Sequence, residues 1–256
     1  MIDTHCHIDF EDYDSDRTDV IKRAKEKLDA VIDSGTSLEG NQTVLNLSKE
    51  NEGFIYPTFG FHPVTSQKCT NEELHEAQKH LIDNINDIVA IGEVGMDFFY
   101  VKDKSLRARQ KEIFTSFIEI ANDYKVPLLM HVRDCEKKAL NIINEYEDLP
   151  YVVFHCFSGS LKTAKRIMEH DNYYMSFSTI LCYSQRHQEL IKDIKLDHVL
   201  TETDSPYLAM TKEERNEPAN VIKACEKIAE IKEMDLNTVD EITTNNAKRE
   251  IGRAHV

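Results

Sequence analysis

Short apolar runs alternate along the chain with longer segments in which apolar residues recur at helical spacing. The apolar runs are nearly continuous, which is typical of parallel strands that are covered on both faces. We predict strands at residues 1–7, 29–35, 53–62, 87–95, 126–132, 151–157, 173–178 and 197–204. Because helical segments separate them, these strands are expected to run parallel and to be joined by right-handed crossovers.

Three of the intervening segments carry helix signals. Thr70 and Glu73 form a capping-box pattern, in which two side chains satisfy amides of the first helical turn. Residues 105–124 place apolar side chains on one helical stripe, at Ile113, Phe114, Phe117, Ile120 and Ala121. Pro218 suits the first turn of a helix whose apolar positions are Val221, Ile222, Cys225 and Ile228.

Eight predicted strands that alternate with helices leave two architectures open, a doubly wound open sheet and a TIM (β/α)8 barrel. A barrel of this kind commonly takes about 250 residues. The chain has 256 residues. No long linker, low-complexity tract or Pro/Gly-rich boundary divides it. We therefore expect one domain over residues 1–256, and the strand count favours the barrel.

Composition and charge exclude several classes of protein. Hydrophobic residues make up 41% of the chain and charged residues 30%, which suits a soluble globular protein. No apolar run reaches the ~18 residues of a membrane span, and the first residues lack the basic and apolar regions of a signal peptide. The net charge of −15 argues against a broad basic surface that clamps duplex nucleic acid, although local phosphate contacts stay possible. We expect no association with membranes.

Cysteine usage points to a reducing compartment. The six cysteines contain no CxxC pair and lie at Cys6, Cys69, Cys135, Cys156, Cys182 and Cys225. In a chain without a secretion signal such cysteines are typically reduced, buried thiols. We therefore predict a cytoplasmic location.

The first ten residues, MIDTHCHIDF, contain two histidines one residue apart. His5 and His7 would share one face of a strand, while Cys6 faces the other way. Asp3 and Asp9 have the same parity as the histidines. Neutral imidazole nitrogen is a common metal ligand, so this spacing indicates a metal site whose other ligands must come from elsewhere.

Unusual polar residues, including these two histidines, fall at the C-terminal ends of the predicted strands. By strand order they are His5 and His7 (first), His62 (third), Glu93 with Asp97 just beyond (fourth), His131 (fifth), His155 (sixth) and Asp204 (eighth). In a barrel those strand ends meet at one mouth, where barrel enzymes carry their active sites. A doubly wound sheet would instead concentrate its site at one switch point, so this distribution favours the barrel more firmly than the strand count.

Each of these residues has an ordinary explanation when it is taken singly. His131 could be hydrogen-bonded to a carbonyl, Glu93 could pair with Arg133, and Asp204 could cap a turn before Pro206. Six of them together are better explained by metal binding: the four histidines His5, His7, His131 and His155 and the two acids Glu93 and Asp204. Six ligands exceed the needs of one tetrahedral ion and suit two ions bridged by a carboxylate.

Strand order suggests how those ligands divide. Glu93 lies between the two groups of histidines in strand order, so it is the candidate for the bridging ligand. Asp204 comes from the last strand, which neighbours the first in a closed barrel, so it should lie near His5 and His7. There it could bind one ion and accept a proton from water.

The motifs DTHCHID, GFHP, GEVGMDF, HVRD, HCFSG, ETDSPYL and RNEP run in order from Asp3 to Pro218. They resemble those of the TatD family of metal-dependent deoxyribonucleases, which belongs to the amidohydrolase superfamily of TIM barrels. The resemblance implies that one ion binds His5, His7, Glu93 and Asp204, and that a second shares Glu93 and binds His131 and His155. It also implies that Asp204 activates the hydrolytic water and that His62 and Arg133 face the substrate phosphate. The alternative for Arg133 is an ion pair with Asp134 or Asp97.

The resemblance implies hydrolysis of phosphodiester bonds in DNA, as a 3′-5′ exonuclease on single strands or 3′ ends, with two divalent metal ions. Mg²⁺ is the family's usual ion, whereas imidazole ligands favour ions such as Mn²⁺ or Zn²⁺. We expect a monomer. Two other functions stay open: ester hydrolysis by another amidohydrolase-type activity, for example on D-aminoacyl-tRNA, and a metal-binding scaffold without turnover. Many amidohydrolases bridge their metals with a carbamylated lysine where this chain has Glu93, which favours the nuclease.

One segment departs from the family pattern. Residues 209–218 read AMTKEERNEP and lack the Arg-Gly pair that family members often carry before the NEP motif. Arg215 is the candidate replacement for a phosphate contact from this loop.

Overall fold

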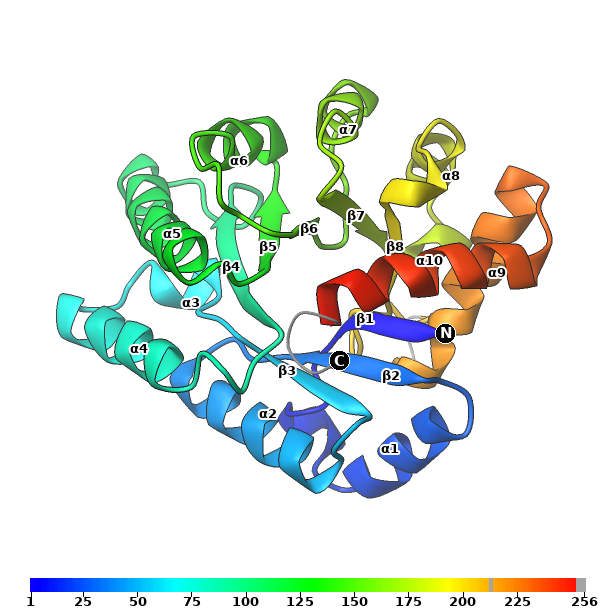
Figure 1. The fold of residues 1–256 in the computed structure, drawn as a ribbon, viewed down its shortest axis with the longest axis horizontal. Helices are drawn as coiled ribbons and strands as arrows, with labels where there is room; N and C mark the ends of the chain where they lie inside the picture. Colours follow the sequence, from blue (N-terminus) through cyan, green and yellow to red (C-terminus); the bar gives the residue numbers. More distant parts are fainter. Residues whose placement is uncertain (212–213, 252–256) are drawn as a thin grey trace.

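Eight parallel strands form one sheet in the order β1 to β8, and alternating helices surround it (Figure 1). The computed structural model describes residues 1–211 and 214–251. The strands are β1 Ile2–Cys6, β2 Ala30–Ser34, β3 Ile55–Phe59, β4 Ala90–Asp97, β5 Leu128–Arg133, β6 Val152–Phe154, β7 Tyr173–Phe177 and β8 Val199–Thr201. Each predicted strand is present, so the TIM barrel is confirmed and the doubly wound sheet is excluded.

The helices lie outside this ring of strands. They are α1 Arg17–Lys25, α2 Leu38–Glu50, α3 Pro63–Ser66, α4 Asn71–Asp83, α5 Lys104–Tyr124, α6 Glu136–Ile143, α7 Leu161–Ile167, α8 Gln185–Lys192, α9 Val221–Lys232 and α10 Leu236–Ile251, with 3-10 turns η1 Glu11–Tyr13, η2 Thr179–Cys182, η3 Leu196–His198 and η4 Pro218–Asn220. The predicted capping box of Thr70 and Glu73 opens α4. The stripe predicted over residues 105–124 is α5, and it buries Ile113, Phe114 and Phe117 against the barrel. Pro218 opens η4, which leads directly into α9.

The ring closes between β8 and β1 through a few hydrogen bonds beyond the end of β8. The Asp204 amide donates to the His5 carbonyl at 2.9 Å, and the His7 amide donates to the Ser205 carbonyl at 2.8 Å. Buried Asp3 accepts a bond from the Thr203 amide at 2.8 Å and one from the Thr203 hydroxyl at 2.6 Å. This seam sets Asp204 beside the two N-terminal histidines, as the closed barrel predicts.

One end of the barrel is filled by apolar side chains and covered by α10. Ile2, Ala30, Val89 and Leu200, from the starts of strands or the residues around them, share an apolar cluster with Ala247 of α10. The red helix α10 crosses the ring in Figure 1, and it contacts β8 and β1. Because this end is closed by apolar side chains, the polar residues lie at the other end of the barrel, where the strands end.

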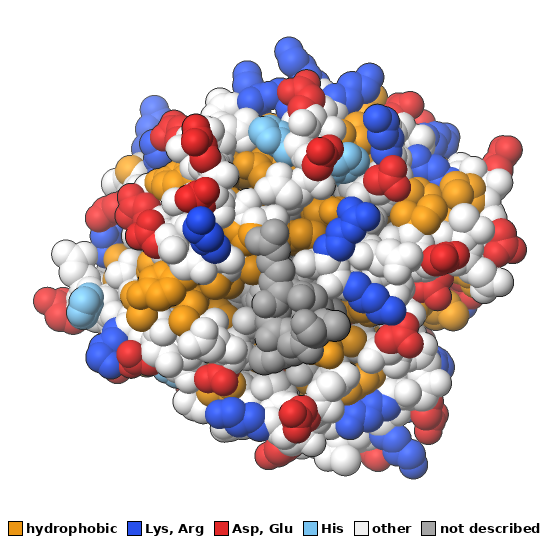
Figure 2. All heavy atoms as spheres, viewed as in Figure 1, with side chains coloured by type: hydrophobic (Ala, Val, Ile, Leu, Met, Phe, Trp, Pro, Cys, Tyr) orange, Lys and Arg blue, Asp and Glu red, His pale blue; other side chains and the backbone are white. Residues whose placement is uncertain are grey.

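The face seen in Figure 2 carries scattered lysine, arginine, aspartate and glutamate side chains with apolar areas between them. Neither sign of charge dominates the visible surface. Among the described residues, no helix combines the length and apolar character that crossing a lipid bilayer requires.

Candidate metal centre

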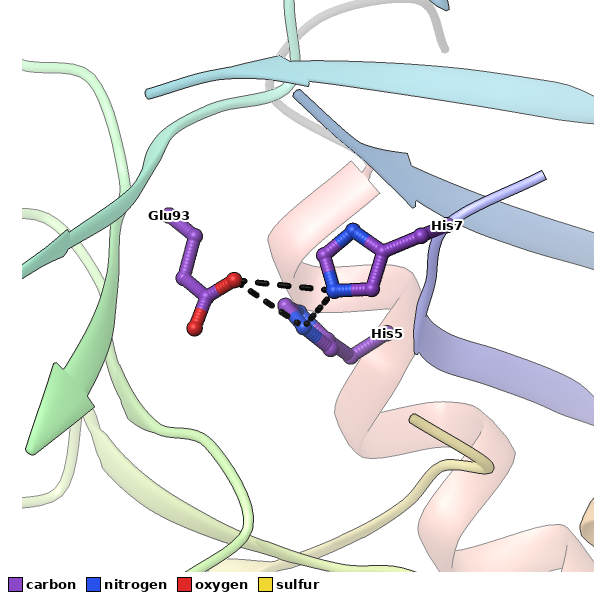
Figure 3. A group of neighbouring side chains, drawn as sticks. All are labelled: His5, His7 and Glu93. Atoms are coloured by element: carbon purple, nitrogen blue, oxygen red, sulfur yellow. Dashed lines mark hydrogen bonds and ion pairs between the residues drawn. The ribbon is translucent and has the colours of Figure 1, made fainter. Parts of the chain in front are cut away.

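The residues predicted for the first metal lie together at the C-terminal end of the barrel. His5 and His7, in and just after β1, point toward Glu93 of β4 (Figure 3). Their Nε2 atoms are 3.2 Å apart, and Glu93 Oε2 lies 3.7 Å from His5 Nε2 and 3.6 Å from His7 Nε2. Asp204 Oδ1 lies 3.6 and 3.7 Å from the same two nitrogens. Four potential donor atoms therefore surround one small volume.

The residues predicted for the second metal meet the other oxygen of Glu93. Glu93 Oε1 lies 2.6 Å from His131 Nδ1 and 3.0 Å from His155 Nε2. His62 approaches the same place, with its Nε2 atom 3.6 Å from Glu93 Oε1 and 3.4 Å from His131 Nδ1. The two oxygens of one carboxylate thus face two different groups of histidines, which is the arrangement that a bridging ligand requires.

Outer hydrogen bonds orient three of the imidazoles. His7 Nδ1 donates to the Ser34 carbonyl at 2.8 Å, and His5 Nδ1 lies 3.1 Å from the Ser34 hydroxyl. The Nε2 atom of His131 points away from Glu93 and lies 3.0 Å from Asp97 Oδ2. A proton on each outer nitrogen leaves the inner nitrogen with a free lone pair, as a metal ligand needs.

The fourth imidazole faces a buried acid that the strand-end reasoning missed. His155 Nδ1 lies 3.6 Å from Oε1 of Glu202, which accepts hydrogen bonds from the Cys156 amide at 2.8 Å and the Ser176 hydroxyl at 2.5 Å. Burial raises the pKa of Glu202 despite these partners. The available signal was a second acid in LTETD, two residues before Asp204.

The charges of the cluster favour a cation. Burial opposes a charge on His7, yet Asp204 and Glu93 raise its pKa to about 9. Burial likewise opposes a charged His155, while Glu93 and Glu202 raise its pKa well above the usual value. Burial alone would raise the pKa of Glu93, but the surrounding histidines hold that pKa well below its ordinary range. Glu93, ionised and surrounded by imidazoles, therefore suits the binding of divalent ions.

The backbone turns sharply where these strands end. Asp134, Cys156 and Asp204 adopt φ values of 61°, 43° and 56°, in the left-handed region that residues other than glycine seldom occupy. Gly95 has φ 153°, and a Cβ there would lie 1.9 Å from the His131 carbonyl oxygen. The second glycine of GEVG therefore lets β4 approach β5 closely beside the centre.

Arg133 has a different partner from those considered above. Its guanidinium lies 4.1 Å from the ring centroid of Phe99 and 5.1 Å from that of Tyr100. In the described part of the chain, no ion pair joins it to Asp97, Asp134 or Glu93. The structure therefore leaves its charge stacked on aromatic rings beside the mouth.

Arg215 is engaged elsewhere. It makes a two-point contact with Asp16, at 2.9 and 2.7 Å, donates to the Asp12 carbonyl, and stacks 4.4 Å from the Tyr13 ring centroid. Lys212 and Glu213 of the same loop lie outside the described residues. Arg215 thus anchors this loop to the segment after β1, and the structure gives no support to a phosphate contact from it.

A (β/α)8 barrel with histidines and carboxylates gathered at its C-terminal mouth defines the class of metal-dependent TIM-barrel hydrolases. Comparison with known proteins agrees with this class. Residues 2–252 match the family model described as "TatD related DNase". The chain belongs to the TatD family, and its class is that of metal-dependent hydrolases that act on ester bonds.

Individual relatives cover nearly the whole chain. The chain is 37% identical to the uncharacterized metal-dependent hydrolase MJ1582 of Methanocaldococcus jannaschii, over 96% of this chain and 94% of that protein. It is 30% identical to the human deoxyribonuclease TATDN3, over 96% of this chain and 93% of that protein. The crystal structure of the TatD homologue YJJV from Escherichia coli K12 superposes with a TM-score of 0.89 at 26% identity, covering 98% of both chains.

Proposed function

We propose that this protein hydrolyses phosphodiester bonds in DNA, as a 3′-5′ exonuclease on single strands or 3′ ends. The single observation that carries the proposal is the position of Glu93. Its Oε2 atom faces His5 and His7, while its Oε1 atom faces His131 and His155. A paired-cation site of this kind suits a reaction in which both the attacking and the leaving oxygen need stabilising.

Two divalent ions are the cofactors that this donor set would hold. His5, His7, Glu93 and Asp204 would bind one ion, and Glu93, His131 and His155 the other. Mg²⁺, Mn²⁺ and Zn²⁺ are the candidates, and the four imidazoles favour the transition ions. Ions bound here would supply Lewis-acid polarisation of the phosphate and would lower the pKa of a water molecule.

The chain's own residues take the remaining roles. The Asp204 side chain is 16% exposed, more than the other carboxylate of the centre, so water can reach it. It is positioned to orient that water and accept its proton. His62 and Arg133 lie at the same mouth and would hold the phosphate oxygens, for which the planar guanidinium is well shaped. In this arrangement Glu93 stays ionised and serves both groups of histidines.

The test of this proposal is the variant Glu93→Ala. We expect it to lose metal-dependent release of nucleotides from single-stranded DNA by at least about a hundredfold, because both ion sites share this ligand. Glu119→Ala, an exposed change on α5, is the matched control and should keep full activity. Nucleotide release by Glu93→Ala at the wild-type rate would contradict the assignment.

The same assay separates the other functions. RNA and an ester substrate such as D-aminoacyl-tRNA belong in the panel beside DNA. If the ester is hydrolysed faster than DNA, the protein has another amidohydrolase activity and the nuclease proposal is wrong. Metal binding without turnover of any substrate would indicate a scaffold.

We also propose one hydrolase domain over residues 1–256, acting as a monomer in the cytoplasm. All six cysteines are free thiols in the structure, and a reducing compartment suits them. Gel filtration tests the monomer, and measurement of the thiol content of the native protein tests whether its cysteines are reduced.

A further inference from the structure

Two large aromatic side chains stand exposed on the loop that follows β4. Phe99 is 44% exposed and Tyr100 is 66% exposed. Contiguous exposed apolar side chains often mark an interaction site, whereas single ones are ordinary. These two directly follow Phe98 and begin two residues after Asp97, which contacts His131 of the metal centre. The pair therefore lies at the rim of the candidate active site.

The loop that carries the pair is fixed to the centre. Asp97 Oδ1 accepts a hydrogen bond from the Tyr100 amide at 2.7 Å, while Asp97 Oδ2 lies 3.0 Å from His131 Nε2. Arg107 donates to the Phe98 carbonyl at 2.8 Å and to the Val101 carbonyl at 2.7 Å. The exposed rings are thus held by their backbone, and one carboxylate connects them to a metal ligand.

Cations accompany the rings. The Phe99 and Tyr100 rings meet edge to face, with centroids 5.0 Å apart and planes at 85°. Arg133 lies 4.1 Å from the Phe99 centroid, and Lys102 Nζ lies 5.3 Å from it. Aromatic rings interleaved with basic side chains are the combination that binds single-stranded nucleic acid, because bases stack on the rings and phosphates pair with the cations.

The charge elsewhere on the rim differs. The segment after β1 carries exposed Glu11 and Asp12, and the chain as a whole has a net charge of −15. A polyanionic strand would be repelled there and attracted toward Arg133 and Lys102. The side of the mouth next to β4 and β5 is therefore the favoured approach for a nucleic acid.

We propose that Phe99, Tyr100 and Arg133 form a rim platform on which an unpaired base beside the scissile phosphate stacks, with Tyr100 as the principal stacking surface. This proposal rests on the nuclease function and gives it a structural basis for preferring unpaired nucleotides. A base within a duplex is already stacked and paired, so it gains little from the platform. Tyr100 is chosen because it is the more exposed ring and lies farther from the Arg133 guanidinium.

Binding of two labelled strands tests the platform. One probe is a six-nucleotide oligothymidylate, and the other has the same length but carries abasic sites. Both are titrated in Ca²⁺, with gels to verify that they stay intact. The wild-type protein should bind the base-bearing strand about tenfold more tightly, which is the usual gain from one base stacked on an aromatic ring. Tyr100→Ala should remove this difference, and Tyr100→Phe should retain it.

Tyr124→Ala is the matched control. Tyr124 is 47% exposed but ends α5, away from the rim, so its loss should leave both affinities unchanged. The platform is overturned if the wild-type protein does not discriminate between the probes, or if Tyr100→Ala weakens both probes equally or neither.

Kinetics separate this proposal from the nuclease function. If only the platform is wrong, wild-type protein and Tyr100→Ala will cleave single-stranded DNA with the same KM. If the nuclease function is wrong, the wild-type protein will show base-dependent binding without metal-dependent cleavage. If both hold, Tyr100→Ala will raise KM for single-stranded DNA about tenfold with little change in kcat.

Discussion

Asp97 shows how a single residue can orient a candidate metal ligand. One of its oxygens faces His131 Nε2 at 3.0 Å, and the other accepts the Tyr100 amide at 2.7 Å. The carboxylate is fully buried, and although burial opposes its charge, the hydrogen bond with His131 lowers its pKa. An ionised Asp97 keeps a proton on the outer nitrogen of His131 and turns the Nδ1 atom toward Glu93.

We therefore expect Asp97→Asn to weaken metal binding. The amide keeps the shape of the side chain but loses its charge, so His131 is held less firmly in the binding tautomer. Loss of such an outer partner typically costs about 10- to 100-fold in metal affinity. Titration calorimetry with Mn²⁺ measures the change.

The neighbouring change Asp134→Asn provides the control. Asp134 is exposed, and asparagine tolerates its left-handed backbone. Its affinity for Mn²⁺ should match that of the wild-type protein. Equal affinities for Asp97→Asn and the wild-type protein would show that Asp97 does not support the ligand.

Sequence reasoning brought the inner residues of the centre and Asp97 together, but not the other supporting residues. The prediction needed only that the C-terminal ends of parallel strands converge, and this places His5, Glu93 and Asp204 at one mouth. The contacts of Ser34 and Glu202 depend on side-chain rotamers and on register between neighbouring strands, which no spacing along the chain reveals. For the same reason the sequence did not indicate that His131 presents Nδ1 inward.

At the scale of an element, the buried Asn216 side chain cross-links the loop after β8, which Arg215 also anchors. The Asn216 amide side chain donates to the Thr203 carbonyl at 3.1 Å and to the Tyr207 carbonyl at 2.8 Å. Its backbone amide donates to the Pro206 carbonyl at 3.0 Å. These bonds fix both ends of the short segment that contains Asp204.

Asn216→Ala should therefore reduce stability and activity together. The buried Thr203 carbonyl would lose its partner, which costs about 1–3 kcal/mol in the free energy of unfolding. Asp204 would also lose its fixed position, so metal-dependent turnover should fall at temperatures where the variant is still folded. Urea denaturation and the DNA assay measure the two effects.

Asn86→Ala is the comparison for this loop. Asn86 is exposed, so its replacement should change the free energy of unfolding by no more than about 0.5 kcal/mol. If Asn216→Ala were as stable and as active as Asn86→Ala, the loop would not depend on this side chain.

The limits of the elements were harder to predict than their order. The apolar run at 151–157 gives a strand only over Val152–Phe154, because the chain adopts a left-handed turn at Cys156. The run at 197–204 begins in η3 and forms a strand only over Val199–Thr201. In both cases the apolar pattern records burial, whereas the strand ends where its hydrogen bonds to neighbouring strands stop.

At the scale of the whole molecule, the candidate metal centre joins parts of the barrel that are distant in sequence. Its candidate ligands come from β1, β4 and β5 and from the residues that follow β1, β6 and β8. The seam between β8 and β1 depends on few backbone hydrogen bonds. One joins Asp204 to His5, and another joins His7 to Ser205. An ion bound to His5, His7 and Asp204 would span this seam directly.

Divalent ions should therefore stabilise the folded protein. The unfolded chain does not hold these ligands together, so an ion present at a hundred times its Kd adds about 2.7 kcal/mol to the free energy of unfolding. For a chain of this size that corresponds to a rise in Tm of about 5–10 °C. Differential scanning calorimetry of the wild-type protein in EDTA and in Mn²⁺ measures the rise. Glu93→Ala should lose most of it while Glu119→Ala keeps it, and an equal rise in both variants would place the stabilising ion outside this centre.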